Sequence, residues 1–156
     1  GKTAAVLQGA MTHAHKLTLY TNQVTAYRFN EYFEEYRNLK VKYRSEDSLA
    51  GHAGTFDINS VEVSVVGDPE IIHQGKHYFL PVDLLFQQVE KHQLDDVEIY
   101  LLPPPWLILL GLLGNDMELA ESLASIGKHQ EEVLKCAQEL GIAFYIKPLV
   151  DELYSK

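Results

Sequence analysis

The chain has 156 residues, 46% hydrophobic and 22% charged, which is typical of one globular domain with a full core and excludes a disordered chain. Its net charge of −9 is uneven: residues 1–45 carry seven Lys and Arg against three Asp and Glu, and residues 46–156 carry six against nineteen. Because an acidic surface repels phosphates and attracts cations, we expect a basic protein partner and neither nucleic acid nor membrane.

Cysteine content and hydropathy narrow the class of protein further. Cys136 is the only cysteine, so one chain holds neither a disulfide nor a cysteine-based metal site. The longest apolar run, Val97–Gly114, includes Glu98 and three prolines and is shorter than the roughly 20 apolar residues of a transmembrane helix. With no secretory signal visible, we expect a cytoplasmic protein without metal or cofactor.

The chain is expected to begin with a flexible or vector-derived arm over residues 1–15, followed by a single domain over residues 16–156. Lys16–Tyr20 predicts a strand, and Thr21 or Asn22 is placed to cap the helix after it. In that helix one apolar stripe is predicted to face the core, with aromatic residues at i, i+3, i+4 and i+7: Phe29, Tyr32, Phe33 and Tyr36.

Alternation over Leu39–Arg44 predicts a second strand, with Val41 and Tyr43 facing inward. Lys40, Lys42 and Arg44 then point outward and form a small basic patch with Arg37. This patch is the local surface whose sign suits a phosphate or an acidic partner.

Ser45–Ser60 is predicted to be an irregular loop, because it contains Gly51 and Gly54 among small polar residues. His52 lies between these glycines and is a candidate site residue in either a functional or a mobile surface loop. Val61–Val65 predicts a strand that ends in a turn at Gly67-Asp68-Pro69. A hairpin around Gln74-Gly75-Lys76 follows, where His73 and His77 are expected to face each other.

Val97–Leu102 is predicted to be the central strand, covered on both faces, because its residues are almost all apolar. We expect Ile99 and Leu101 to be essentially fully buried, while Glu98 must sit at the strand's entrance, find a hydrogen-bond donor or mark a site. Prolines 103–105 end the strand and start a helix that contains Trp106.

The C-terminal part is predicted to contain a helix capped by Asn115 or Asp116 and a second helix ended by Gly141. An apolar strand at Ile142–Ile146 and a short helix at Pro148–Tyr154 then close the chain. The predicted fold class is α/β or α+β: one mixed, mostly parallel sheet with helices on its faces and an antiparallel hairpin. The layout of this half resembles the STAS fold, although no motif carries residue roles over.

Two functions are compatible with these patterns. No nucleophile elbow, zinc-binding helix or dinucleotide fingerprint is present, which favours a non-catalytic protein-binding module of the immunity, antitoxin or adaptor type. The alternative is an enzyme or small-ligand binder with a site at the carboxyl ends of the strands, near Trp106. The candidate binding residues are His52, Asp57, His73, His77 and Trp106; a pocket shared by two or three of the first four would favour the alternative.

Overall fold

The computed structural model describes residues 3, 7, 9, 16–46, 48–94 and 96–155. Its main sheet has the strand order β1 (Lys16–Thr21), β4 (Val61–His73), β3 (Leu49–Ile58), β2 (Arg37–Ser45), and β5 (Lys76–Phe79) pairs with the far end of β4. β1 and β4 are parallel, whereas the other pairings among the described residues are antiparallel. The predicted mixed α/β domain with a mixed sheet is therefore confirmed, with less parallel pairing than expected.

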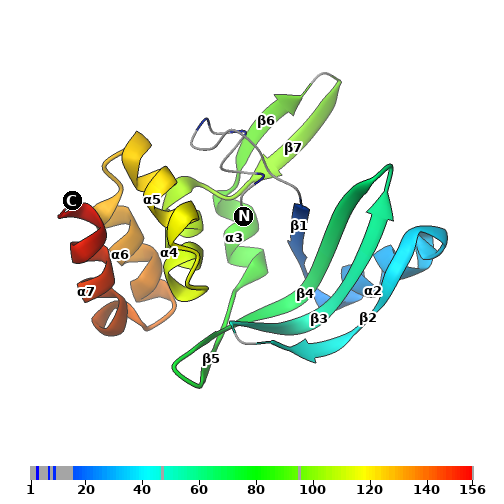
Figure 1. The fold of residues 1–156 in the computed structure, drawn as a ribbon, viewed down its shortest axis with the longest axis horizontal. Helices are drawn as coiled ribbons and strands as arrows, with labels where there is room; N and C mark the ends of the chain where they lie inside the picture. Colours follow the sequence, from blue (N-terminus) through cyan, green and yellow to red (C-terminus); the bar gives the residue numbers. More distant parts are fainter. Residues whose placement is uncertain are drawn as a thin grey trace.

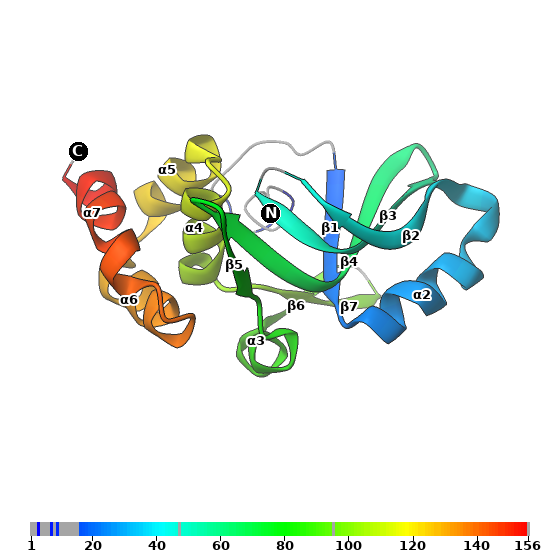
Figure 2. The ribbon, with the colours of Figure 1, turned by 90° about the horizontal axis from the view of Figure 1, so that it is seen from below.

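Helices lie at both ends of this sheet. α2 (Gln23–Tyr32) and the short 3₁₀ helix η1 (Glu34–Tyr36) follow β1. Beyond β5 come α3 (Val82–Gln88), the hairpin of β6 (Glu90–Leu94) and β7 (Val97–Leu101), and then α4 (Pro104–Leu113), α5 (Met117–Ile126), α6 (Gln130–Glu139) and α7 (Ala143–Tyr154). Figures 1 and 2 show α4–α7 gathered at one end of the molecule and α2 at the other, with the main sheet between them.

α2 begins where its sequence predicts. The Asn22 side chain accepts a hydrogen bond from the Thr25 N–H at 2.8 Å, which caps the first turn. Gly67 of β4 lets the helix lie close, because a Cβ there would meet the Ala26 Cβ at 2.7 Å. The predicted aromatic stripe is only half right: the helix ends at Tyr32, so Phe29 and Phe33 pack on the sheet while Tyr32 remains 82% exposed.

The predicted loop at 45–60 is wrong, because Leu49–Ile58 forms β3. Gly51 has a φ of 149° beside a register shift between Ala50 and His52, and a Cβ on Gly54 would meet the Leu39 carbonyl oxygen at 2.8 Å. These glycines serve a bulge and a close strand approach. The turn predicted at Gly67-Asp68-Pro69 is also wrong, since β4 continues through it and Asp68 accepts the Gln23 N–H at 3.1 Å.

The hairpin predicted after β4 is confirmed. Gln74 and Gly75 both have positive φ, as a two-residue hairpin turn requires. His73 and His77 are not directly opposite each other, because His73 pairs with Lys76 and His77 with Ile72.

The interior position predicted for Val97–Leu102 is wrong. β7 pairs with β6 in a separate two-stranded antiparallel sheet, so among the described residues no second strand pairs with it. Leu101 is buried as predicted, Ile99 is half-buried, and Tyr100 is 44% exposed. One side of this hairpin packs on the core helices, and apolar composition alone does not distinguish that arrangement from a two-sided strand.

The strand predicted at Ile142–Ile146 is wrong as well, because Ala143–Tyr154 forms one helix with Pro148 inside it. A proline there removes the hydrogen bond to the carbonyl of Phe144, a residue that is 86% exposed, so water can solvate the freed group. The C-terminal half therefore lacks the STAS-like strand–helix repeat.

The buried residues form two clusters. One joins α3, β7 and the C-terminal helices around Trp106, and the other lies between α2 and the main sheet around Phe56. Cys136 is buried in the first cluster, and burial raises the pKa of its thiol to about 12. Within the described part of the chain, no helix is both long and apolar enough to span a membrane.

Candidate ligand site along strand β1

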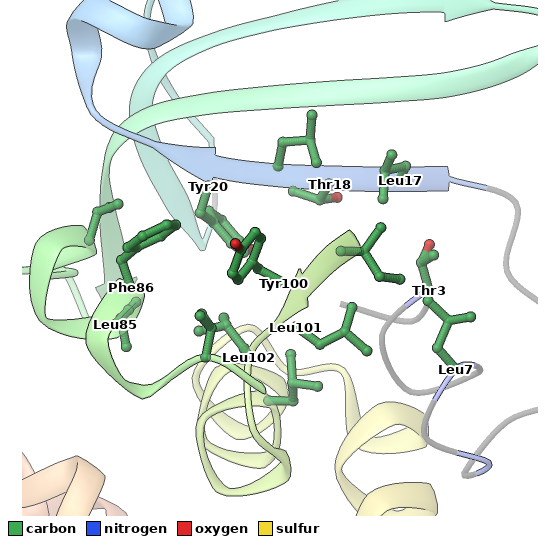
Figure 3. Close-up of a pocket in the computed structure, with 15 residues that line it drawn as sticks. Thr3, Leu7, Leu17, Thr18, Tyr20, Leu85, Phe86, Tyr100, Leu101 and Leu102 are labelled. Carbon is green, nitrogen blue, oxygen red and sulfur yellow. The ribbon is translucent and has the colours of Figure 1, made fainter. Parts of the chain in front are cut away.

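A cleft runs along β1, at the edge of the main sheet. It has a volume of about 400 Å³ and is lined mainly by apolar side chains of β1, α3, β7 and the start of α4, with Thr3 and Leu7 at one end (Figure 3). Small-molecule sites typically have roughly 300–1,000 Å³ and a mostly apolar lining. The cleft therefore has the size and chemistry of a ligand pocket.

Three aromatic side chains lie at the other end of the cleft, where Figure 3 shows Tyr20, Phe86 and Tyr100 close together. The ring centroids of Phe86 and Tyr100 are 5.5 Å apart, and Phe86 is 62% exposed. Burial raises the pKa of Tyr20, so its hydroxyl stays protonated at neutral pH. Large apolar side chains exposed beside a pocket are typical of interaction sites.

Charged groups border the aromatic end. Lys91 Nζ lies 3.2 Å from Glu98 Oε1 and 5.3 Å from the centre of the Tyr100 ring. The Tyr100 hydroxyl donates to Glu98, and this hydrogen bond, together with Lys91, lowers the pKa of the Glu98 carboxyl. Glu98 is thus an exposed carboxylate held by two donors.

A second, smaller cavity of about 170 Å³ lies on the face of the main sheet away from α2. Thr18 of β1 pairs with Ser64 of β4, and Ser64 in turn pairs with Thr55 of β3. All three line the cavity, which places three hydroxyl groups side by side across adjacent strands. We call Thr18, Ser64 and Thr55 the hydroxyl row.

Charged residues lie beside the hydroxyl row. In the preceding row Lys16 Nζ pairs with Glu62 Oε1 at 3.0 Å, and Asp57 lies opposite Glu62. Lys16, Arg44 and Glu46 line the cavity, so its ionisable lining apart from Tyr20 consists of two cations and one anion. Tyr20 and Thr18 line this cavity and the cleft, which makes the two spaces neighbours along β1.

The predicted site residues do not meet in one pocket. His52 lies in β3 on the α2 side, with Nδ1 3.3 Å from the Tyr27 hydroxyl, and His77 Nδ1 lies 2.8 Å from Glu70 Oε2. Trp106 is fully buried and donates from Nε1 to Gln88 Oε1 at 2.9 Å. Asp57 shares the sheet face of the hydroxyl row, and binding roles for these residues and His73 remain predictions.

The residues that line the two cavities carry only a weak sequence signal. Phe86 fits the apolar stripe of its helix and Tyr100 an apolar strand, so both read as core residues. The hydroxyl row joins residues from three separate strands, so it exists only once the strand register is known. Alternation in β2 does identify Lys42 and Arg44 as outward cations, and Lys42 pairs with Ala53, which lines the second cavity.

Comparisons with known proteins provide a likeness of fold. No family model matches the sequence, and no curated protein matches it. A crystal structure from Thermotoga maritima, described as a "putative nucleotidyltransferase", superimposes with a TM-score of 0.65 at 21% identity, covering 80% of this chain and 77% of that one.

This likeness corrects the functional prediction. The chain shares its fold with a protein described as an enzyme, so the reading as a non-catalytic protein-binding module is wrong, and the alternative of an enzyme or small-ligand binder fits better. The two cavities beside β1 are the candidate sites for such a ligand.

Proposed function

We propose that the chain binds a nucleotide in the cleft along β1, with the base beside Phe86 and Tyr100. The observation that supports this proposal is that Phe86 is 62% exposed and Tyr100 44% exposed at one end of an apolar cleft. Bases stack on aromatic side chains, which is worth about 1–3 kcal/mol per base. The fold of the Thermotoga maritima protein supports the choice of a nucleotide among aromatic ligands.

The polar groups at the aromatic end suit a base as well. Tyr20 has a protonated hydroxyl that can donate to a ring nitrogen or carbonyl oxygen. Lys91 and Glu98 supply a donor and an acceptor at the rim. A small number of polar groups in an apolar pocket is the usual way to orient a ligand.

Isothermal titration calorimetry with adenosine, guanosine, cytidine and uridine tests this proposal, because nucleosides isolate the contribution of the base. At least one nucleoside should bind, and Phe86→Ala should weaken it about 5- to 150-fold, the equivalent of losing one stacking contact. Tyr32→Ala is the matched control, since it removes an aromatic ring that is 82% exposed on α2, outside the lining of the cleft. Absence of binding by all four nucleosides, or equal losses in Phe86→Ala and Tyr32→Ala, would reject the proposal.

A further inference from the structure

Ser64 is the most buried member of the hydroxyl row. Ser64 is 7% exposed and lines the second cavity, whereas Thr18 and Thr55 on either side of it are half-buried. A serine hydroxyl that lines a cavity can donate one hydrogen bond and accept others. Flanked by Thr18 and Thr55, Ser64 therefore offers a hydrogen-bonding position to an atom in the cavity.

The cations of this cavity indicate what kind of atom fits. Arg44 is fixed by two backbone carbonyls, with Nε 3.2 Å from the Ala53 oxygen and Nη2 3.1 Å from the Lys40 oxygen. A guanidinium has five N–H groups, so after these two hydrogen bonds Arg44 still has N–H donors for a ligand. Lys16 is tied to Glu62 by an exposed ion pair, which is worth only about 0–1 kcal/mol and is readily exchanged.

A divalent cation fits this cavity poorly. Nucleotidyl transfer by polymerases uses two metal ions, and such ions prefer carboxylate ligands. The polar lining of the cavity consists instead of the hydroxyl row, Tyr20, two cations and Glu46, and no three His, Cys, Asp or Glu side chains of the described residues form a metal-binding group. Hydroxyl groups, Lys and Arg are the usual contacts of phosphate oxygens.

We infer that the hydroxyl row, together with Lys16 and Arg44, binds a phosphate group directly, without a divalent cation. This inference rests on the proposed function in taking the phosphate as part of the nucleotide whose base lies in the cleft. Thr18 and Tyr20 line both cavities, so one ligand can extend from the aromatic end of the cleft to the hydroxyl row.

Calorimetry in EDTA tests the inference with each nucleoside, its 5′-monophosphate and inorganic pyrophosphate. The monophosphate should bind about tenfold more tightly than its nucleoside, the size of one charge-assisted hydrogen bond. Ser64→Ala and Thr55→Val, at residues that line only the second cavity, should each remove most of this gain and leave nucleoside affinity unchanged. Thr55→Ser keeps the hydroxyl and should retain the gain, and Ser125→Ala, an exposed serine of α5, is the matched control.

The ion pair of Lys16 allows a test with a variant that should strengthen phosphate binding. Glu62→Gln removes the carboxylate that holds Lys16, so it should tighten binding of the monophosphate and of pyrophosphate. Lys16→Met should weaken both. If Ser64 and Lys16 had only structural roles, Glu62→Gln would not tighten binding, and the effects of these variants would not depend on the presence of a phosphate group.

The outcomes separate this inference from the proposed function. Equal affinity for nucleoside and monophosphate rejects the phosphate site while leaving nucleotide binding intact. A gain that requires added Mg²⁺ rejects direct binding. Pyrophosphate binding that Ser64→Ala abolishes, without any nucleoside binding, supports the phosphate site and rejects the proposed function; absence of all binding rejects both.

Discussion

Glu98 illustrates how a single side chain finds its place in this fold. An ionisable side chain in an apolar strand must lie at the end of the strand, accept a hydrogen bond from a donor or belong to a functional site. In the hairpin its carboxylate is exposed and receives hydrogen bonds from Lys91 on the neighbouring strand and from Tyr100 two residues along. Residues two apart on a strand lie on the same face, so the Tyr100 contact follows from strand geometry.

This arrangement predicts a measurable pKa change. Tyr100→Phe removes the largest cause of the lowered pKa of Glu98, so that pKa should rise toward its ordinary value. Because the folded-state pKa is lowered, the contacts stabilise the fold above the ordinary carboxylate pKa, and this contribution disappears as the pH falls through the lowered value. The difference in stability between variant and wild type should therefore vanish at low pH.

Carboxyl carbon NMR over a pH series measures the titration directly. Tyr32→Phe, which removes the hydroxyl of an exposed tyrosine on α2, should leave the Glu98 curve unchanged. An unchanged curve in Tyr100→Phe would show that the hydroxyl contact does not persist in solution.

Element boundaries were mispredicted where a residue that usually ends an element lies inside one. Pro148 reads as the start of a short helix after an apolar strand, yet α7 runs from Ala143 to Tyr154. Gly51 and Gly54 read as a loop, yet they lie in β3. In α7 packing of the apolar face outweighs a local penalty of about 3 kcal/mol, whereas the glycines of β3 are required by the bulge and by the close strand approach.

Pro148→Ala distinguishes the two accounts of the C-terminal segment. In a helix interior proline costs about 3 kcal/mol, so its replacement should raise the free energy of unfolding, by up to about that amount. At the first position of a helix the same change would be neutral or slightly destabilising. Chemical denaturation followed by circular dichroism gives the answer, and a destabilised Pro148→Ala would argue for the strand-then-helix arrangement.

At the scale of the whole molecule, β4 connects the two buried clusters. Val63 and Val65 belong to the cluster under α2, while Ile71 of the same strand belongs to the cluster around Trp106. A continuous 13-residue strand shared by both clusters should make their unfolding cooperative. This bears on the expectation that residues 16–156 behave as a single domain.

Phe56→Ala tests this coupling from a distance. Phe56 is fully buried beneath α2, and its truncation should cost about 3–5 kcal/mol. Trp106 lies in the other cluster. If unfolding is cooperative, the free energy of unfolding measured in urea from the fluorescence of Trp106 falls by the same amount. Val24→Ala, at a site 61% exposed on α2, should not shift it, and an unmoved Trp106 transition in Phe56→Ala would establish two independently unfolding units.

The sequence by itself determined the features that depend on a few neighbouring residues. These are the Asn22 cap, the turn at Gln74-Gly75, the helix that starts within the three prolines, and the end of α6 at Gly141, which has a φ of 70°. Such features are set within about four residues by capping and turn geometry, so local patterns suffice. The outward cations of β2 belong to the same group.

Only the tertiary structure decided which strands pair and which apolar faces stay exposed. Thr18, Thr55 and Ser64 lie in three strands, and neither their order nor their register follows from alternation, because a slip of one residue would turn a side chain to the other face. The exposure of Phe86 and Tyr100 likewise depends on the hairpin pairing β6 with β7 instead of joining the main sheet. Which strands pair depends on how much apolar surface the whole folded chain buries. This total cannot be read from any short stretch of sequence.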